Sequence, residues 1–240
     1  MSTSAAWQSR SVSRTHAGLV RARNEDNLVD RPQAGLWAVA DGMGGHAGGE
    51  QASALIRSRL EEVDPADDPA SYVARVRRAL ERADAELRKS STSSGSAVVV
   101  LLAAGDRYAC VWAGDSRLYR LRGGRLERLT RDHSLVEELV ASGTLKPEVA
   151  HRHPLANRIT RAVGVGDPLK LDVAQGRLTP GERYLLASDG LHGVIPDGVI
   201  AELVAAPDLD EASDRLMAAV MKAGAPDNVT VVLVAIDPVP

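Results

Sequence analysis

Four aspartates stand where apolar, strand-like segments of this sequence meet turns. Asp41 follows the run 36–40, Asp115 follows the run 108–113 and Gly114, Asp189 follows the run 184–188, and Asp227 precedes the run 229–234. Carboxylates brought to strand ends from distant parts of a chain can build an all-oxygen site for hard divalent cations. An Asp before Gly or Asn is by itself a common turn signal, so the prediction depends on the recurrence. The pattern indicates a metal-dependent enzyme.

A second cluster joins cations and carboxylates in one predicted loop, Arg21-Ala22-Arg23-Asn24-Glu25-Asp26-Asn27. The guanidinium of an arginine can bind phosphate oxygens through two parallel N–H donors. The neighbouring acids can order water that is bound to a metal. A solvated charge cluster would have the same composition, so the spacing alone leaves both interpretations open.

A dinucleotide-binding site is an alternative for part of the same region. The segment Gly42-Met43-Gly44-Gly45-His46-Ala47 fits the fingerprint G-x-G-x-x-G/A, and Glu61 and Glu62 follow about twenty residues later, as that fingerprint requires. Two features disfavour it. Asp41 would place a negative charge beside a pyrophosphate, which prefers backbone N–H groups at a helix N-terminus. The chain also lacks a repeated alternation of strands and helices.

The elements that must position these residues suggest an α+β fold. Strands are predicted over 36–40, 97–104, 108–113, 117–121, 170–173, 183–187 and 229–236, and helices over 50–62, 69–89, 196–205 and 209–223. Short turns at 104–107 and 122–125 are typical of hairpins, which pair strands antiparallel. We therefore expect an antiparallel sandwich covered by helices. The segment 130–166 is rich in His and Arg and is interpreted as an inserted flap.

Composition excludes several classes of protein. The 240 residues are 44% hydrophobic, which suits one large domain or two small ones, and the net charge of −3 gives no sign of a nucleic-acid or anionic-membrane binder.

The single cysteine, Cys110, lies in an apolar run and is expected to be a buried hydrophobe rather than a nucleophile. The N-terminal residues lack the apolar stretch of a signal peptide, and no apolar run is long enough to span a bilayer. A soluble, cytoplasmic protein is expected.

The ordered motifs together resemble the metal-dependent Ser/Thr protein phosphatases of the PP2C (PPM) type, in the short, stand-alone bacterial form. The resemblance covers roughly residues 10–236 and is carried by RARNEDN at 21–27, DGMGGH at 41–46, GDSR at 114–117, SDGL at 188–191 and DNVT at 227–230. It implies a PP2C-like sandwich of two antiparallel β-sheets flanked by pairs of α-helices, with a metal centre at one end. We expect a single domain over residues 8–238 that includes the flap at about 130–166.

The resemblance also implies a role for each matching residue. Two Mn²⁺ or Mg²⁺ ions are expected, bridged by Asp41, with the Gly42 carbonyl on one ion and Asp189 and Asp227 on the other. A third, weaker ion is expected at Asp115. The acids that would hold metal-bound waters around this centre are Glu25 and Asp26, and the residue that would bind the substrate phosphate is Arg21. Two ions about 4 Å apart would make a hydroxide available near neutral pH to attack phosphorus in line.

The identity of the general acid is left open by one departure from the family pattern. Met43 stands where many eukaryotic members have a histidine, and Met cannot donate a proton. His46 is the nearest replacement, although a metal-bound water or a purely structural role for this histidine are alternatives. In the flap, His151, Arg152, His153 and Arg158 are either substrate contacts or surface charge.

The function implied is a protein serine/threonine phosphatase that hydrolyses phosphoserine and phosphothreonine in proteins. Its expected partners are phosphorylated proteins and a cognate bacterial Ser/Thr kinase, in the setting of a type VI secretion cluster, with no nucleic acid and no membrane. The alternative is a non-catalytic, phosphoprotein-binding regulatory module on the same fold. The presence of Asp41, Asp189, Asp227 and Arg21 favours catalysis over that alternative.

Overall fold

The computed structural model describes residues 7–44, 48–90, 94–146, 149, 153–155, 158–166 and 168–239. In this part of the chain, ten strands form two antiparallel sheets of five. The first sheet has the order β1 (Trp7–His16), β10 (Val229–Pro238), β9 (Arg183–Ala187), β6 (Arg117–Arg122) and β7 (Arg125–Arg128). The second has the order β2 (Asp26–Arg31), β3 (Leu36–Gly44), β4 (Ser94–Ala104), β5 (Arg107–Ala113) and β8 (Asp172–Arg177).

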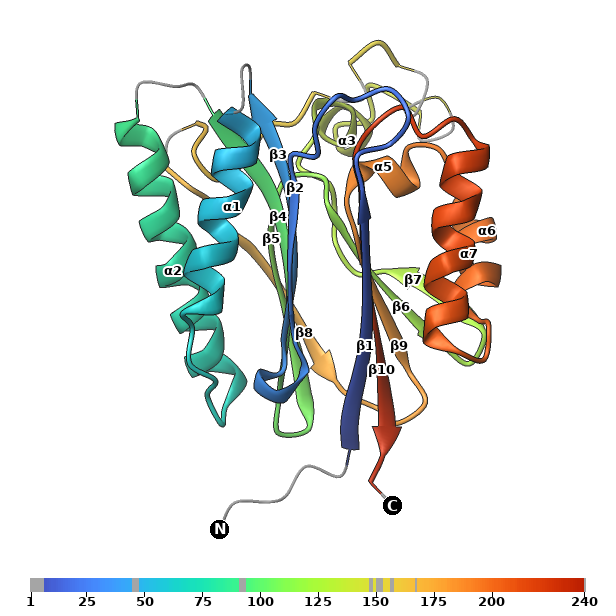
Figure 1. The fold of residues 1–240 in the computed structure, drawn as a ribbon. Coiled ribbons are helices and arrows are strands. Elements are labelled where there is room, and N and C mark those ends of the chain that lie inside the picture. Colours follow the sequence, from blue (N-terminus) through green and yellow to red (C-terminus); the bar gives the residue numbers. More distant parts are fainter. Residues whose placement is uncertain are drawn as a thin grey trace.

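The two sheets stack face to face, and helices cover both outer faces (Figure 1). The first pair is α1 (Gly48–Glu61) and α2 (Pro69–Lys89), which pack on the second sheet, and the other is α6 (Asp197–Val204) and α7 (Leu209–Lys222), which pack on the first. Short elements complete the described chain: η1 (Pro32–Ala34), α3 (Leu135–Ala141) and α5 (Asp189–His192). The expected sandwich of two antiparallel sheets flanked by helices is confirmed.

Local sequence explains where the long helices begin. The side chain of Asp68 caps α2 by accepting a hydrogen bond from the Ser71 N–H at 2.8 Å, and Pro69 follows it at the first helical position. Asp208 caps α7 in the same way, through the Glu211 N–H at 3.0 Å. Apolar residues that recur at helical spacing along α2 are buried in the layer between this helix and the second sheet: Val73, Val76, Leu80, Ala83 and Leu87.

The core has three apolar layers, one between each sheet and its helices and one between the two sheets. Because side chains alternate along a strand, neighbouring residues of one strand belong to different layers. On β3, Leu36, Ala38 and Ala40 face α1 and α2, while Trp37 and Val39 face the opposite sheet. The layer between the sheets holds four of the seven aromatic residues of the chain: Trp37, Tyr108, Trp112 and Tyr184. A chain without phenylalanine thus fills its central layer with its few large rings among aliphatic side chains.

The structure departs from the sequence prediction at several elements. Strands β1, β2 and β7 were absent from the prediction, because the polar residues of β1, the charged loop before β2 and the four residues of β7 give no clear apolar alternation. Asp26 opens β2 rather than lying within a loop. Strand β3 continues through Asp41 to Gly44, so this aspartate lies inside a strand and not at its end. Strand β8 begins two residues later than expected.

None of the described helices combines the length and the apolar composition needed to cross a membrane.

Candidate metal centre

One end of the sandwich carries a cleft of about 740 Å³ in which the predicted residues converge. The residues of the prediction that line it are Arg21, Glu25, Asp41, Gly42, Asp115, Asp189 and Asp227. They arrive from the β1–β2 loop, β3, the β5–β6 turn, α5 and the turn before β10. A second hollow of about 810 Å³ lies beside Trp7 and Gly105, and its lining in the described chain has a single titratable side chain, Asp67. The chemistry therefore belongs to the first cleft.

Strand pairing brings Asp41 and Asp26 together. In the antiparallel register of β2 and β3, Asp26 lies directly opposite Asp41. Asp41 has the same parity on β3 as Trp37 and Val39, so its side chain faces the space between the two sheets. Two carboxylates directly opposite each other repel, and a cation between them removes that cost.

Asp26 is 6% exposed and is held from the opposite sheet. Its Oδ2 accepts a hydrogen bond from Ser188 Oγ at 2.8 Å, and Ser188 Oγ in turn accepts one from the Thr230 N–H at 2.9 Å. Its Oδ1 is buried without a hydrogen-bond partner in the described part of the structure. Ser188 directly precedes Asp189, which is a predicted metal ligand. The hydrogen bond therefore connects Asp26, which is predicted to hold metal-bound water, to the segment that carries this ligand.

Asp227 and Asn228 tie the β1–β2 loop to the start of β10. Asp227 Oδ2 accepts from Arg21 Nη2 at 2.6 Å, and its Oδ1 accepts from the Asn228 N–H at 2.8 Å. The Asn228 side chain accepts from the Glu25 N–H at 2.8 Å and donates to the carbonyls of Ala17 and Arg23 at 2.9 and 2.8 Å. The sequence prediction gave Asn228 no role, although its place after a predicted ligand was visible. In the structure it fixes the shape of the loop that carries Arg21.

Gly42 is packed too tightly for any other residue. A Cβ atom there would lie 2.2 Å from the Gly49 carbonyl oxygen and 2.5 Å from the Glu25 carbonyl oxygen. Its N–H donates to the Glu25 carbonyl at 3.2 Å. The structure thus argues against the dinucleotide-binding alternative. The Gly42–Gly44 part of the fingerprint lies in strand β3 rather than at a helix N-terminus, and the Gly42 N–H is bonded to Glu25 and is not free to bind a pyrophosphate.

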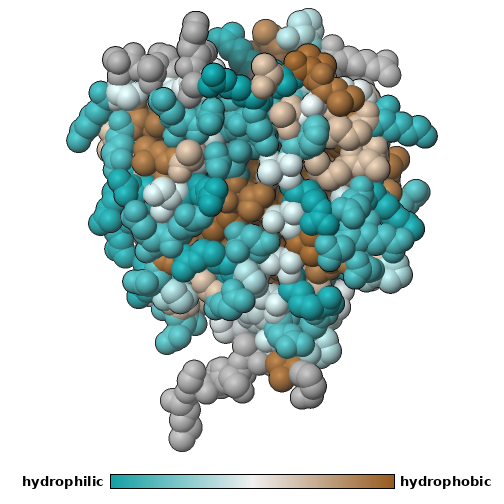
Figure 2. Space-filling view, viewed as in Figure 1, coloured by the Kyte–Doolittle hydropathy of each residue, from teal (hydrophilic) through white to brown (hydrophobic). Residues whose placement is uncertain are grey.

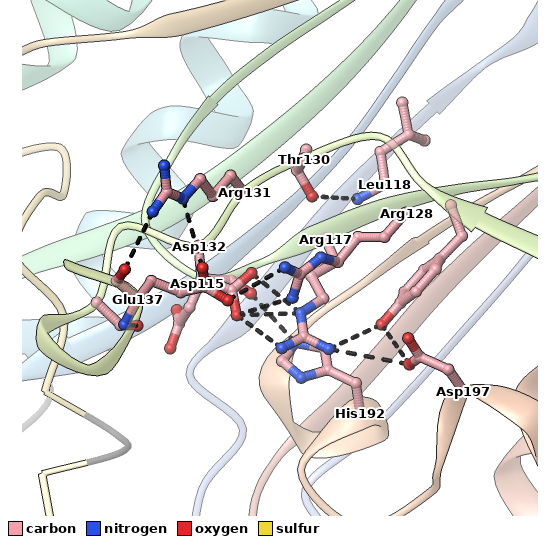
Figure 3. Close-up of polar contacts among 12 residues, drawn as sticks. Asp115, Arg117, Leu118, Arg128, Thr130, Arg131, Asp132, Glu137, His192 and Asp197 are labelled. Carbon is pink, nitrogen blue, oxygen red and sulfur yellow. Dashed lines mark hydrogen bonds and ion pairs between the residues drawn. The ribbon is translucent and has the colours of Figure 1, made fainter. Parts of the chain in front are cut away.

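The turn that carries Asp115 is clamped by a buried polar network (Figure 3). Arg117 Nη2 donates to Asp132 Oδ2 at 2.6 Å, and its Nε lies 3.0 Å from Asp132 Oδ1. His192, on α5, donates from Nε2 to the Asp115 carbonyl at 3.1 Å. Burial and the nearby Arg117 charge lower the pKa of His192 to about 3, so this ring is neutral. Since α5 begins at Asp189, the contact links the segments of two predicted ligands.

His133 holds the other side of the same turn. Its N–H donates to the Gly114 carbonyl at 2.9 Å, and its Nδ1 accepts from the Gly114 N–H at 3.2 Å. The remaining proton is therefore on Nε2, which donates to Asp172 at 3.1 Å. The ring stacks on Trp112 with an interplanar angle of 11°. His133, at the start of the predicted flap, therefore fixes the backbone of Gly114 next to Asp115. The sequence prediction had given His133 no such role.

Burial and mutual repulsion shape the electrostatics of the cleft. Burial, followed by the charges of Asp26, Asp189, Asp115 and Asp227, raises the pKa of Asp41 well above its usual range. Burial is also the main cause that raises the pKa of Asp26 to about 7, of Asp115 to about 7 and of Asp189 to about 6. The hydrogen bond and charge of Asp227 raise the pKa of Arg21. A set of buried carboxylates that resist losing their protons is a candidate functional site.

The donor set fits a hard divalent cation. The converging side-chain donors are carboxylate oxygens, joined by the Gly42 carbonyl that the resemblance assigns. Burial, and after it the charges of the neighbouring acids, raises the pKa of Asp41, and a bound cation would offset both effects. No three His, Cys, Asp or Glu side chains among the described residues form a ready-made cluster around one point. Both oxygens of Asp227, for example, have partners in Arg21 and Asn228.

Three of the predicted residues, His46, His151 and Arg152, lie outside the described residues. In the flap, Arg158 is exposed, and His153 Nδ1 accepts from the Leu155 N–H at 3.2 Å. Ile159 is the flap residue that lines the cleft.

Comparisons with known proteins agree with this geometry. The family model for "Protein phosphatase 2C" matches residues 3–139. The serine/threonine protein phosphatase PstP of Mycobacterium tuberculosis is 38% identical over 230 residues, which cover 93% of this chain. The chain spans 44% of the length of that relative.

Solved structures give the same result over the whole fold. PppA, described as a key regulatory component of T6SS in Pseudomonas aeruginosa, has 43% identity and a TM-score of 0.86, covering 95% of this chain and 98% of that one. The catalytic domain of PstP in complex with 2 manganese ions has 36% identity and a TM-score of 0.86, covering 96% and 99%.

Proposed function

This chain belongs to the protein phosphatase 2C family of metal-dependent protein phosphatases, and we propose that it hydrolyses phosphoserine and phosphothreonine in proteins. The observation that carries the proposal is the convergence of Asp41, Asp189, Asp227 and Arg21 on one cleft. The raised pKa values of Asp41 and Asp189 support it, because such carboxylates gain most from a bound cation.

Five residues would hold the ions in this proposal. Asp41, the Gly42 carbonyl, Asp189 and Asp227 would hold two Mn²⁺ or Mg²⁺ ions, with Asp41 shared between them, and Asp115 would hold a third, weaker ion. When bound, the ions supply a hydroxide from water near neutral pH and neutralise charge on the phosphoryl group. The manganese-bound PstP neighbour supports this choice of metal.

The remaining side chains bind and orient. Glu25 and Asp26 would hold water molecules that are bound to the ions, and would help to orient them. Arg21, whose side chain is 57% exposed beside Asp227, binds the phosphoryl oxygens and stabilises the charge that grows on them.

His46 is proposed as the general acid that protonates the leaving alkoxide. His46→Ala is then expected to lower turnover of alkyl phosphates more than that of an aryl phosphate, whose leaving group needs no proton. An equal loss on both substrates would remove this role.

The proposed substrates are phosphoproteins made by a cognate bacterial Ser/Thr kinase. The PppA neighbour supports a type VI secretion setting for them. A cytoplasmic location follows from this proposal, because kinases use cytoplasmic ATP. A single domain over residues 8–238, with a flap at about 130–166, remains a prediction.

The test is phosphate release from a phosphothreonine peptide with Mn²⁺, with Mg²⁺ and with EDTA, beside Asp189→Asn. We expect release that requires metal and is lost in the variant. Folded protein that releases no phosphate under any metal would make the regulatory, phosphoprotein-binding module the better interpretation.

A further inference from the structure

Most of the large hydrophobic side chains that are exposed among the described residues lie in two segments that contribute residues to the lining of the cleft. Seven are exposed among the described residues, and five of them lie in the two segments that border the cleft. These five are called the apolar rim: Leu19 and Val20 in the β1–β2 loop, and Val149, Leu155 and Val165 in the flap. The other two are Val199 on α6 and Val239 near the C-terminus. Scattered apolar residues need no explanation, whereas a concentration at one place indicates an interaction surface.

The β1–β2 loop presents its two apolar residues on a fixed backbone. The Leu19 N–H donates to the Ala225 carbonyl at 2.8 Å, and the Asn228 side chain holds the carbonyls on both sides, at Ala17 and Arg23. Leu19 and Val20 are nevertheless 64% and 71% exposed, the highest values among the seven. Because hydrogen bonds fix the backbone of this loop, the exposure of Leu19 and Val20 does not result from a poorly held segment. Figure 2 shows hydrophobic residues on the surface at this end of the molecule.

The flap side of the rim is anchored next to the cleft as well. Val165 lies over Gly95, where a Cβ atom would be 2.4 Å from Val165 Cγ2. Gly95 pairs with Met43 across β3 and β4, and Met43 lines the cleft. Both bordering segments lie at the same end of the sandwich (Figure 1).

We propose that the apolar rim binds aliphatic side chains of the substrate close to its phosphorylated residue. This inference rests on the proposed function. Val20 immediately precedes Arg21, and consecutive Cα atoms are about 3.8 Å apart. A substrate segment whose phosphate binds Arg21 advances about 3.3 Å per residue, so residues within a few positions of the phosphorylated one come close to Val20 and Leu19. Burying an aliphatic side chain against Leu19, Val20 or Val165 removes apolar surface from water on both partners.

The test compares two phosphothreonine peptides that differ only in the residues flanking the phosphothreonine, leucine in one and serine in the other. The enzymes are the wild type, L19S/V20S, V165S and the matched control V199S, which removes an exposed valine away from the cleft. Para-nitrophenyl phosphate, too small to reach the rim, reports the basal activity with Mn²⁺, and thermal melting reports folding. We expect the wild type and V199S to prefer the leucine peptide by about tenfold in kcat/KM, the lower range for one aliphatic contact.

In L19S/V20S we expect this preference to fall to about twofold, while hydrolysis of para-nitrophenyl phosphate stays unchanged. V165S gives the same measurement if the double variant does not fold. Equal kcat/KM for the two peptides in the wild type, or a preference that survives in both rim variants, overturns the inference and leaves the phosphatase activity standing. A wild-type protein that hydrolyses neither peptide nor para-nitrophenyl phosphate overturns the proposed function itself, and the inference with it.

Discussion

Replacing Asp26 by asparagine is expected to stabilise the metal-free protein at alkaline pH. Asp26 is 6% exposed, lies opposite Asp41 in the β2–β3 register, and has one oxygen without a partner in the described structure. Burial, aided by the charges of Asp189 and Asp227 and opposed by hydrogen bonds from Thr230 and Ser188, raises its pKa from 3.8 to about 7. An asparagine side chain at this position would be neutral at every pH, with nearly the same shape.

The sign follows from proton linkage. The folded protein holds the Asp26 proton more tightly than the unfolded chain, so the carboxyl group costs no stability below about pH 4. The cost grows as the pH rises from about 4 to about 7, between the unfolded and folded pKa values, and levels off above pH 7 at about 4 kcal/mol. Asp26→Asn removes this cost. For a chain of this size, that difference raises the Tm by on the order of 10 °C.

The assay is thermal unfolding in EDTA, followed by circular dichroism at pH 4.5 and pH 8. We expect the variant to be more stable than the wild type at pH 8, and the gap to be small at pH 4.5. Added Mn²⁺ should narrow the gap at pH 8, because the cation neutralises the wild-type carboxylates. A variant less stable than the wild type at pH 8 in EDTA would refute the reasoning, since Asp26 would then be held in its charged form by its hydrogen bonds.

Three other changes test separate parts of the structure. Arg21→Ala should lower kcat/KM on an aryl phosphate about 100-fold. It should change the free energy of unfolding by less than about 1 kcal/mol, because the ion pair of Arg21 with Asp227 is exposed. Steady-state kinetics and thermal melting measure the two effects, and a large loss of stability would contradict this expectation. Asp132→Asn should cost about 3–5 kcal/mol in urea unfolding because it leaves the Arg117 guanidinium buried without its carboxylate. The matched Glu61→Gln, which removes an exposed pair on α1, should cost about 0.5 kcal/mol or less, and similar costs for both would argue against a special role for burial. Cys110 is fully buried, which raises the pKa of its thiol, so iodoacetamide should leave the native protein unlabelled and label it in urea; rapid native labelling, read by mass spectrometry, would be the contrary result.

Local sequence patterns determined most of the helices and strands. Pro69 and the cap at Asp68 mark the start of α2, and its apolar residues at helical spacing determine the face that packs on the sheet. The hairpin turns likewise made the antiparallel pairing of β4 with β5 and of β6 with β7 predictable. These signals are short in range, because capping, turn formation and helical periodicity involve residues only a few positions apart.

The sequence by itself also determined the predicted acids and the phosphate-binding arginine, through five short motifs whose order resembles one family. It did not determine how the acids are held. Glu25 is tied to Asn228 across 203 residues, and Asp26 to Ser188 across 162. The register that sets Asp26 opposite Asp41 arises from the pairing of β2 with β3 within one sheet, and β2 was not predicted. The contacts of His133 and His192 with the Asp115 turn join segments that are 19 and 77 residues apart in the chain. Each depends on a hydrogen bond between chain segments that no local pattern connects, so only the tertiary structure decided them.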